Sequence, residues 1–337
     1  MTTRYSRQEL FLGSEAQANI NEASVIIIGA GALGSASAEM LVRAGIGCVT
    51  IIDRDYVELS NLQRQQLYTE EDVRNKLPKA IAAKTRLEQI NSEVMINSFV
   101  EDVNGLNIEG LIQNHSVIVD ATDNFETSLI VNDAAIKHGI PYVFGACVGS
   151  YGLAYPIIPG ETPCLHCLLN HLPMDGLTCD TVGVISPIVQ MTAALQVTQV
   201  LKLLSGETLS PQLQSMDIWK SEKAEINVSQ LKNKSCSTCG EQPAYPFLLF
   251  ENQMKTDVLC GRDAVQLRPG LKPKTYALPQ LLERVENYVT NSILNQYLLS
   301  CEFEEHRIVF FQDGRAIVHG TKDVKKARAV YNRFIQL

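Results

Sequence analysis

A short apolar strand that runs directly into a glycine-rich turn limits the fold of this chain more than any other feature. Residues 23–28 (ASVIII) are apolar and rich in β-branched side chains, and residues 29–34 (GAGALG) match the pattern Gly-x-Gly-x-x-Gly. Apolar residues then recur at helical spacing as far as Gly45, where a helix can end, and residues 48–53 read as a second strand. This strand–helix–strand order is a βαβ unit, which predicts an α/β fold.

The same alternation continues, and it predicts a Rossmann-like, mostly parallel sheet because parallel neighbours need crossover connections. The spacing of Ser6 and Glu9 fits a capping box, so a short helix is expected to start there. Pro78 is expected as the first residue of another helix. Glycine and proline punctuate residues 151–163, which indicates antiparallel strands at the sheet edge. Further strands are predicted over 94–100, 116–120 and 141–148, and further helices over 125–138 and 185–204.

The chain is expected to form two domains, one over residues 1–241 and a small C-terminal α+β domain over 246–337. Two apolar runs within 308–318 flank an Asp-Gly turn, which is a strong hairpin signal. Apolar residues over 324–334 then recur at the spacing of an amphipathic terminal helix.

Composition excludes several classes of protein. The chain has 337 residues, 45% of them hydrophobic, and a formal net charge of -8. A mildly acidic chain is a poor partner for nucleic acid or an anionic membrane. No apolar run approaches the roughly 18 residues of a spanning helix, and the first residues lack the apolar core of a signal peptide. We therefore expect a soluble, cytoplasmic protein with no nucleic-acid or membrane partner.

The glycine turn predicts a nucleotide site. Gly29, Gly31 and Gly34 would let the backbone approach a phosphate at the positive end of the following helix. Asp53 ends the next strand, where an acidic residue can bind ribose hydroxyls. The pattern fits NAD as well as ATP, so an NAD-dependent oxidoreductase stays open at this point, as does a glycine turn with a purely structural role.

Residues 53–65 (DRDYVELSNLQRQ) decide between these readings. This run resembles the ThiF/MoeB/HesA family, relatives of ubiquitin-activating enzymes, and the resemblance extends over about residues 4–241. It implies an ATP-dependent adenylyltransferase: the C-terminal glycine carboxylate of a ubiquitin-like sulfur-carrier protein attacks the α-phosphate, giving an acyl-adenylate and pyrophosphate. The nucleotide-binding residues that the resemblance implies are Gly29, Gly31, Ala32, Gly34, Asp53, Asp55, Ser60, Asn61, Leu62, Gln63, Arg64, Lys79, Asp123 and Asn124. Ala32 departs from the family, which has a further glycine there, but its methyl group should leave room for ATP.

Charge builds on phosphate oxygens in such a reaction, so fixed cations would provide most of the catalysis. Arg64 and Lys79 match the family's catalytic cations, and Asp123 matches its magnesium-binding aspartate. Arg7 matches an arginine that family homodimers insert into the partner's ATP site. The plainer alternatives are a solvated Lys79, a surface Arg7, and an Asx cap for the helix after Asn124.

Four of the nine cysteines form two Cys-x-x-Cys pairs. Cys164, Cys167, Cys236 and Cys239 offer four soft ligands, which suit a structural Zn²⁺ site. The family closes its first domain with such a site, while redox pairing or unbound thiols are the alternatives. His166 lies between ligands and is expected to be exposed rather than coordinating.

Cys179 lies in a loop predicted over 170–182 and matches a family cysteine that can link covalently to the activated carrier or carry sulfur; it could equally be a spectator thiol. Cys260 and Cys301 are expected as core residues of the C-terminal unit. That unit shows no rhodanese cysteine loop and looks like the extension on some bacterial thiazole-pathway members.

The family resemblance also implies a homodimer and two partners. One is a carrier protein that ends in Gly-Gly, of the ThiS type for thiamine or the MoaD type for molybdopterin. The other is a sulfur donor such as a cysteine desulfurase. A non-catalytic binder of a ubiquitin-like protein is the remaining alternative.

Overall fold

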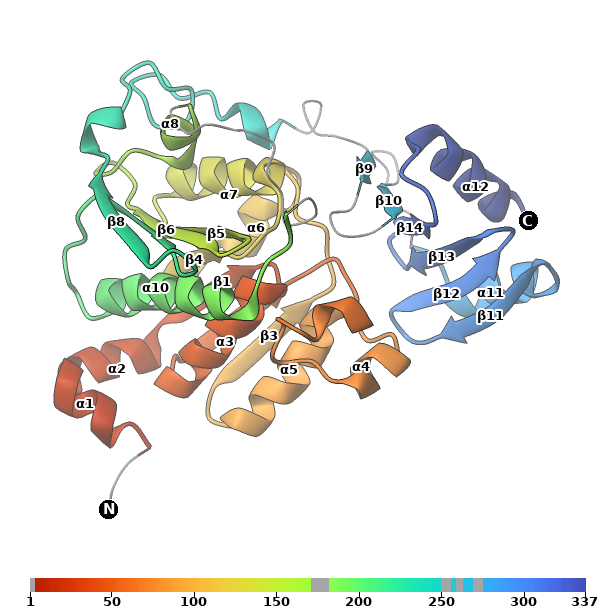
Figure 1. The fold of residues 1–337 in the computed structure, drawn as a ribbon, viewed down its shortest axis with the longest axis horizontal. Helices are drawn as coiled ribbons and strands as arrows, with labels where there is room; N and C mark the ends of the chain where they lie inside the picture. The colour runs from red at the N-terminus through yellow and green to blue at the C-terminus, as the bar shows by residue number, and fades with distance from the viewer. Residues whose placement is uncertain (1–3, 171–181, 250–255, 259–262, 269–274) are drawn as a thin grey trace. The chain divides into compact units, whose positions relative to one another are not determined.

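The computed structural model describes residues 4–170, 182–249, 256–258, 263–268 and 275–337 (Figure 1). The chain divides into two compact units, Met1–Gln253 and Met254–Leu337, and each has a sheet of its own. No helix within these described ranges combines the length and apolarity needed to cross a bilayer.

The first unit contains an eight-stranded sheet with the order β3-β2-β1-β4-β5-β6-β7-β8. The strands on the β3 side run parallel as far as β5, and β6 to β8 are antiparallel. This sheet confirms the predicted fold class. Its strands are β1 (Ser24–Ile28), β2 (Cys48–Ile52), β3 (Met95–Phe99), β4 (Val117–Asp120), β5 (Tyr142–Val148), β6 (Tyr151–Ile157), β7 (Gln212–Asp217) and β8 (Glu222–Asn227).

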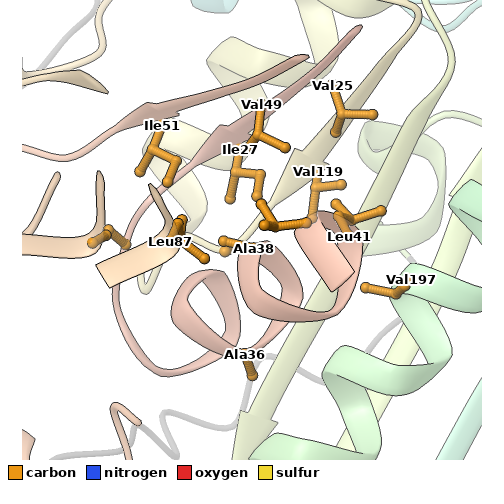
Figure 2. Close-up of a cluster of buried hydrophobic side chains, with 14 of the residues drawn as sticks. Val25, Ile27, Ala36, Ala38, Leu41, Val49, Ile51, Leu87, Val119 and Val197 are labelled. Atoms are coloured by element: carbon orange, nitrogen blue, oxygen red, sulfur yellow. The ribbon is translucent and has the colours of Figure 1, made fainter. Parts of the chain in front are cut away.

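Helices cover both faces of this sheet (Figure 1). Alternate residues of β1 point to opposite faces, as the strand period requires: Ile27 packs in the cluster with α3 and α5, and Ile26 in the cluster with α6 and α7. Figure 2 shows the first cluster, in which Leu41 and Leu87 lie against the β-branched residues of the sheet. The helices are α1 (Ser6–Leu12), α2 (Ser14–Glu22), α3 (Ala32–Ala44), α4 (Glu70–Arg74), α5 (Lys79–Ile90), α6 (Ile108–Ile112), α7 (Phe125–His138), α8 (Leu165–Leu169) and α10 (Ser186–Leu204), with short 3₁₀ turns η1 (Leu59–Asn61), η2 (Ser229–Leu231) and η3 (Pro246–Leu248).

The short helix expected at Ser6 is confirmed as α1, but its cap differs from the expectation. Tyr5 is the N-cap and makes no side-chain cap, so the predicted capping box is wrong. Pro78 is the N-cap of α5 rather than its first residue, because it has an extended ψ of 141°. This moves Lys79 to the first position of the helix.

The second unit is an antiparallel sheet with the order β11-β12-β13-β14-β10-β9. The predicted hairpin is confirmed as β13 and β14, and the terminal helix as α12. The structure divides the chain later than the expected 241–246, because η3 packs on α7 of the first unit. The elements of this unit are β9 (Thr256–Val258), β10 (Ala264–Leu267), α11 (Leu278–Val285), η5 (Glu286–Tyr288), β11 (Val289–Leu294), β12 (Leu298–Phe303), β13 (His306–Phe311), β14 (Ala316–His319) and α12 (Val324–Gln336).

Candidate functional site

The glycine turn between β1 and α3 is shaped by close backbone contacts. Gly29 has a φ of +96°, and a Cβ there would lie 2.6 Å from the carbonyl oxygen of Ala121. A Cβ on Gly34 would collide with the carbonyl of Gly29. Gly31 differs from both: the nearest atom to a Cβ on it is Nε2 of Gln65, at 3.8 Å. Two glycines therefore permit the packing, and Gly31 leaves the N-terminus of α3 open to a ligand.

Asp53 holds this turn in place. Its Oδ2 accepts a hydrogen bond from the backbone N–H of Ala30 at 2.6 Å, and its Oδ1 accepts one from Asp55 at 2.6 Å. Burial raises the pKa of Asp53 above its usual value, although the nearby Lys79 cation opposes the shift. The phenol of Tyr68 donates to the carbonyl of Ala30 at 2.5 Å. Tyr68 is a support that the sequence analysis missed, because nothing in its spacing links it to the turn.

Lys79 is buried, so it is not a solvated surface lysine. Its side chain is only 6% exposed, and its Nζ lies 3.1 Å from Oδ2 of Asp55. The backbone N–H of Lys79 also donates to the carbonyl of Asp55 at 2.9 Å. A lysine at the first position of α5 opposes the helix dipole. The ion pair with Asp55 offsets the unfavourable interaction with the dipole and fixes the cation beside the buried Asp53.

Within the predicted segment 53–65, Leu59–Asn61 form the 3₁₀ turn η1, which has a capping box of its own. Oδ1 of Asn61 accepts from the N–H of Glu58 at 3.0 Å, and the side chain of Glu58 accepts from the N–H of Asn61 in return. Arg64 is half-buried, and its Nη1 donates to the carbonyl of Ser60 at 3.0 Å. Asn61 is therefore committed to the shape of the turn, while the guanidinium of Arg64 keeps donors for a ligand.

The predicted site residues Asp123 and Asn124 follow the end of β4. Asp120 is buried, and its carboxylate accepts from the phenol of Tyr142 at 2.5 Å and from the N–H of Thr122 at 2.9 Å. Asp123 is exposed at the carboxyl edge of the sheet, where ligands bind in parallel α/β proteins. Oδ1 of Asn124 accepts from the N–H of Thr127 at 2.8 Å and caps α7, as the plainer alternative anticipated.

Arg7 lies away from these groups in its own chain. The adjoining Gln8 donates to the carbonyl of Ala44, the last residue of α3, at 2.8 Å. The glycine turn stands at the opposite end of that 13-residue helix, about 20 Å away at 1.5 Å per residue. An arginine side chain does not span that distance, so the site of one chain is not completed by its own Arg7.

The four predicted zinc ligands come together in space. The ligand atoms of Cys164, Cys167, Cys236 and Cys239 all lie within 4.8 Å of one another. Two sulfur pairs, Cys164–Cys236 and Cys167–Cys239, are 3.7 and 3.5 Å apart. Zn–S bonds of about 2.3 Å at tetrahedral angles put sulfurs about 3.8 Å apart, so the residues present fit zinc.

Residues of α7 support this cluster. Oδ1 of Asn132 accepts from the N–H of Leu165 at 2.8 Å, within the first Cys-x-x-Cys segment. The buried carboxylate of Asp133 accepts from the hydroxyl of Thr238, in the second Cys-x-x-Cys segment, at 2.5 Å, and from the N–H of Phe247 at 2.8 Å. Sequence reasoning missed both, although two adjacent polar residues in a helix whose neighbours are buried were a usable signal.

The predictions for four further cysteine and histidine residues have different outcomes. His166 is half-buried rather than exposed, because its ring packs edge-on against Phe247 with centroids 5.3 Å apart. Cys301 is buried in the core of the second unit as predicted, and burial raises its pKa to about 12. Cys179 and Cys260 lie outside the described residues.

Comparison with known proteins agrees with this geometry. Residues 5–238 match the ThiF family, and the four cysteines and the glycine turn are in place. The chain belongs to the ThiF family. This confirms the resemblance drawn from residues 53–65.

Three known proteins resemble this chain to different extents. The sulfur carrier protein ThiS adenylyltransferase of Bacillus subtilis is 54% identical over 337 residues, which cover 99% of this chain and 100% of that protein. The molybdopterin-synthase adenylyltransferase of Salmonella typhimurium is 30% identical over 243 residues, 71% of this chain and 96% of that protein. A crystal structure of Escherichia coli MccB with ATP superposes with a TM-score of 0.62 at 25% identity, covering 71% of this chain and 74% of that one.

Proposed function

We propose that this ThiF-family chain uses ATP to adenylate the C-terminal glycine carboxylate of a ubiquitin-like sulfur-carrier protein. The observation that carries the proposal is the 54% identity to the Bacillus subtilis ThiS adenylyltransferase over 99% of the chain. The buried Lys79 beside the glycine turn supports it, because a cation fixed at a phosphate site is what phosphoryl chemistry needs. The relative solved with ATP shares the fold of this region.

The residues have distinct parts in the reaction. A carboxylate oxygen of the carrier attacks the α-phosphorus of ATP, and the bond to the bridging oxygen breaks to release pyrophosphate. The N-terminus of α3 and the cations of Lys79 and Arg64 stabilise the charge that builds on the phosphate oxygens. The exposed carboxylate of Asp123 would hold Mg²⁺, which takes few protein carboxylates and fills its shell with phosphate oxygens. When bound, Mg²⁺ neutralises phosphate charge.

A ThiS-type carrier of thiazole synthesis is favoured over a MoaD-type carrier. The ThiS adenylyltransferase relative matches the whole chain, including the second unit, whereas the molybdopterin relative matches 71% of it. A nicotinamide oxidoreductase would leave Arg64, Lys79 and the four cysteines without a role. A non-catalytic binder would be free to lose the catalytic cations, and this chain retains them.

The proposed working form is a cytoplasmic homodimer with zinc bound by the four cysteines. Arg7 is exposed on α1 beside Leu10 and Phe11, whose exposed fractions are 79% and 88%. Apolar side chains this exposed suit an interface, and an interface at α1 would carry Arg7 into the partner's site. A sulfur donor such as a cysteine desulfurase is the proposed second partner: its persulfide would displace AMP from the adenylate to give an acyl disulfide, which a thiol reductant would cleave to the thiocarboxylate. Cys179 is a candidate covalent carrier in this step.

ATP–pyrophosphate exchange tests both the activity and the choice of carrier. The purified protein is incubated with Mg²⁺, ATP and labelled pyrophosphate, with either a ThiS-type or a MoaD-type carrier, or with none. Exchange that depends on the ThiS-type carrier is the expected result. Exchange with the MoaD-type carrier alone would reassign the pathway, and no exchange with either would reject adenylation.

A further inference from the structure

We infer that Gln65 is a further nucleotide-binding residue, whose side-chain amide contacts the phosphate region of ATP at the N-terminus of α3. The inference rests on the proposed function, in that the ligand is taken to be ATP. Gln65 closes the conspicuous segment 53–65, yet neither the glycine turn nor the set of cations includes it.

The side chain of Gln65 is buried without being satisfied. Its exposed fraction is 4%, and its Oε1 has no hydrogen-bond partner among the described residues. A buried carbonyl oxygen left in this state costs about 1–3 kcal/mol, and buried polar groups in folded proteins are nearly always paired. A buried amide that the protein itself leaves unpaired is therefore a candidate for pairing by a ligand.

The position of the amide identifies that ligand. Nε2 of Gln65 is the nearest atom to a Cβ built on Gly31, at 3.8 Å, and Gly31 is the N-cap of α3. The amide thus faces the open side of the turn, where the first N–H groups of a 13-residue helix attract an anion. The segment around Gln65 is held over the turn by Tyr68, whose phenol donates to the carbonyl of Ala30.

ATP has the chemistry to satisfy both ends of this amide. Nε2 can donate to a phosphate oxygen and so add a side-chain donor to the backbone donors of α3. Oε1 can accept from a water bound to the phosphates.

The test replaces Gln65 with methionine, which has a similar volume and no amide. Hydrogen bonds to charged groups contribute enough that Gln65→Met should weaken ATP binding about 10- to 100-fold. Adenosine, which lacks phosphates, should bind the variant and the wild type equally. Gln66→Met is the matched control, because Gln66 is exposed and donates to Glu39; it should bind ATP like the wild type.

Thermal unfolding without ligand separates a binding role from a structural one. Removing an unsatisfied buried oxygen should leave the melting temperature of Gln65→Met unchanged or higher, whereas the upward shift on adding ATP should shrink. If Gln65→Met does not fold, Gln65→Glu keeps the size, removes the donor and should discriminate against ATP more strongly still.

Two results would overturn the inference: an unchanged dissociation constant for ATP in the Gln65 variant, or an equal loss of affinity for ATP and adenosine. The proposed function fails in a different way. A wild type that binds ATP through Gln65 but exchanges no pyrophosphate with any carrier would leave this contact standing and reject adenylation.

Discussion

Lys79 is the residue on which the proposed chemistry depends most. It is buried against Asp55 and lies close enough to Asp53 to affect its pKa, so one cation faces two carboxylates. Replacing Lys79 with alanine should lower ATP–pyrophosphate exchange by at least about 100-fold, the cost of losing one preorganised charge partner in an active site, while carrier binding persists. Lys84→Ala is the control, because Lys84 is on the same helix but only half-buried, in a surface ion pair with Glu88. Undiminished turnover in Lys79→Ala would remove Lys79 from the mechanism.

Asp120 gives a prediction about pH. Burial raises the pKa of Asp120 above its usual value of 3.8. The folded state then binds a proton more tightly than the unfolded state, so this stabilisation is complete below pH 3.8 and is lost as the pH rises through the raised pKa. Replacing Asp120 with asparagine should make the free energy of unfolding fall less steeply as the pH rises from 3.8 through the raised pKa. Urea unfolding measured at a series of pH values would show it, and parallel curves for the two proteins would count against it.

Helix α7 is the element that links the two sites. Asn124 and the preceding Asp123 stand at its N-terminus beside the glycine turn. Farther along the helix, Asn132 and Asp133 accept hydrogen bonds from the two Cys-x-x-Cys segments. The glycine turn is secured separately by Asp53 and Tyr68, without help from the cysteines. Loss of the metal should therefore lower the stability of the fold before it lowers the affinity for ATP.

Zinc removal tests this order. Chelation should lower the melting temperature while ATP affinity is still retained, and Cys236→Ser should do the same. Cys48→Ser is the control, because Cys48 lies on β2 outside the cluster. Metal analysis of protein purified without chelator should find about one zinc per chain. Protein that contains no zinc, or that loses ATP binding first on chelation, would contradict this account.

At the scale of the whole molecule, the proposed role of Arg7 requires a second chain. Arg7 stands at the far end of α3 from the glycine turn of its own chain, so in the proposed homodimer it would act in the partner's site. Mixing Arg7→Ala with Lys79→Ala should then restore about one quarter of wild-type activity, because half of the dimers are mixed and each has one complete site. Arg64→Ala mixed with Lys79→Ala is the control and should restore nothing, since both residues serve the same site. No recovery in the first mixture would reject the shared site.

The sequence was informative wherever local pattern and tertiary packing agree. Residues 125–138 were predicted and observed as α7, because Asn124 caps one end and Gly139, with a φ of +69°, ends the other. The capping box at Ser6 failed, since the chain before α1 has no extended cap geometry. The support given by Tyr68 arises only when distant segments meet, and no local signal marks it.

The most direct test of the central claim is the intact mass of the carrier after a brief incubation with this protein, ATP and Mg²⁺. The account predicts a ThiS-type carrier heavier by one AMP, with the added mass on its C-terminal glycine and absent when Lys79→Ala replaces the wild type. A carrier that is never adenylated by active, zinc-loaded protein would contradict it.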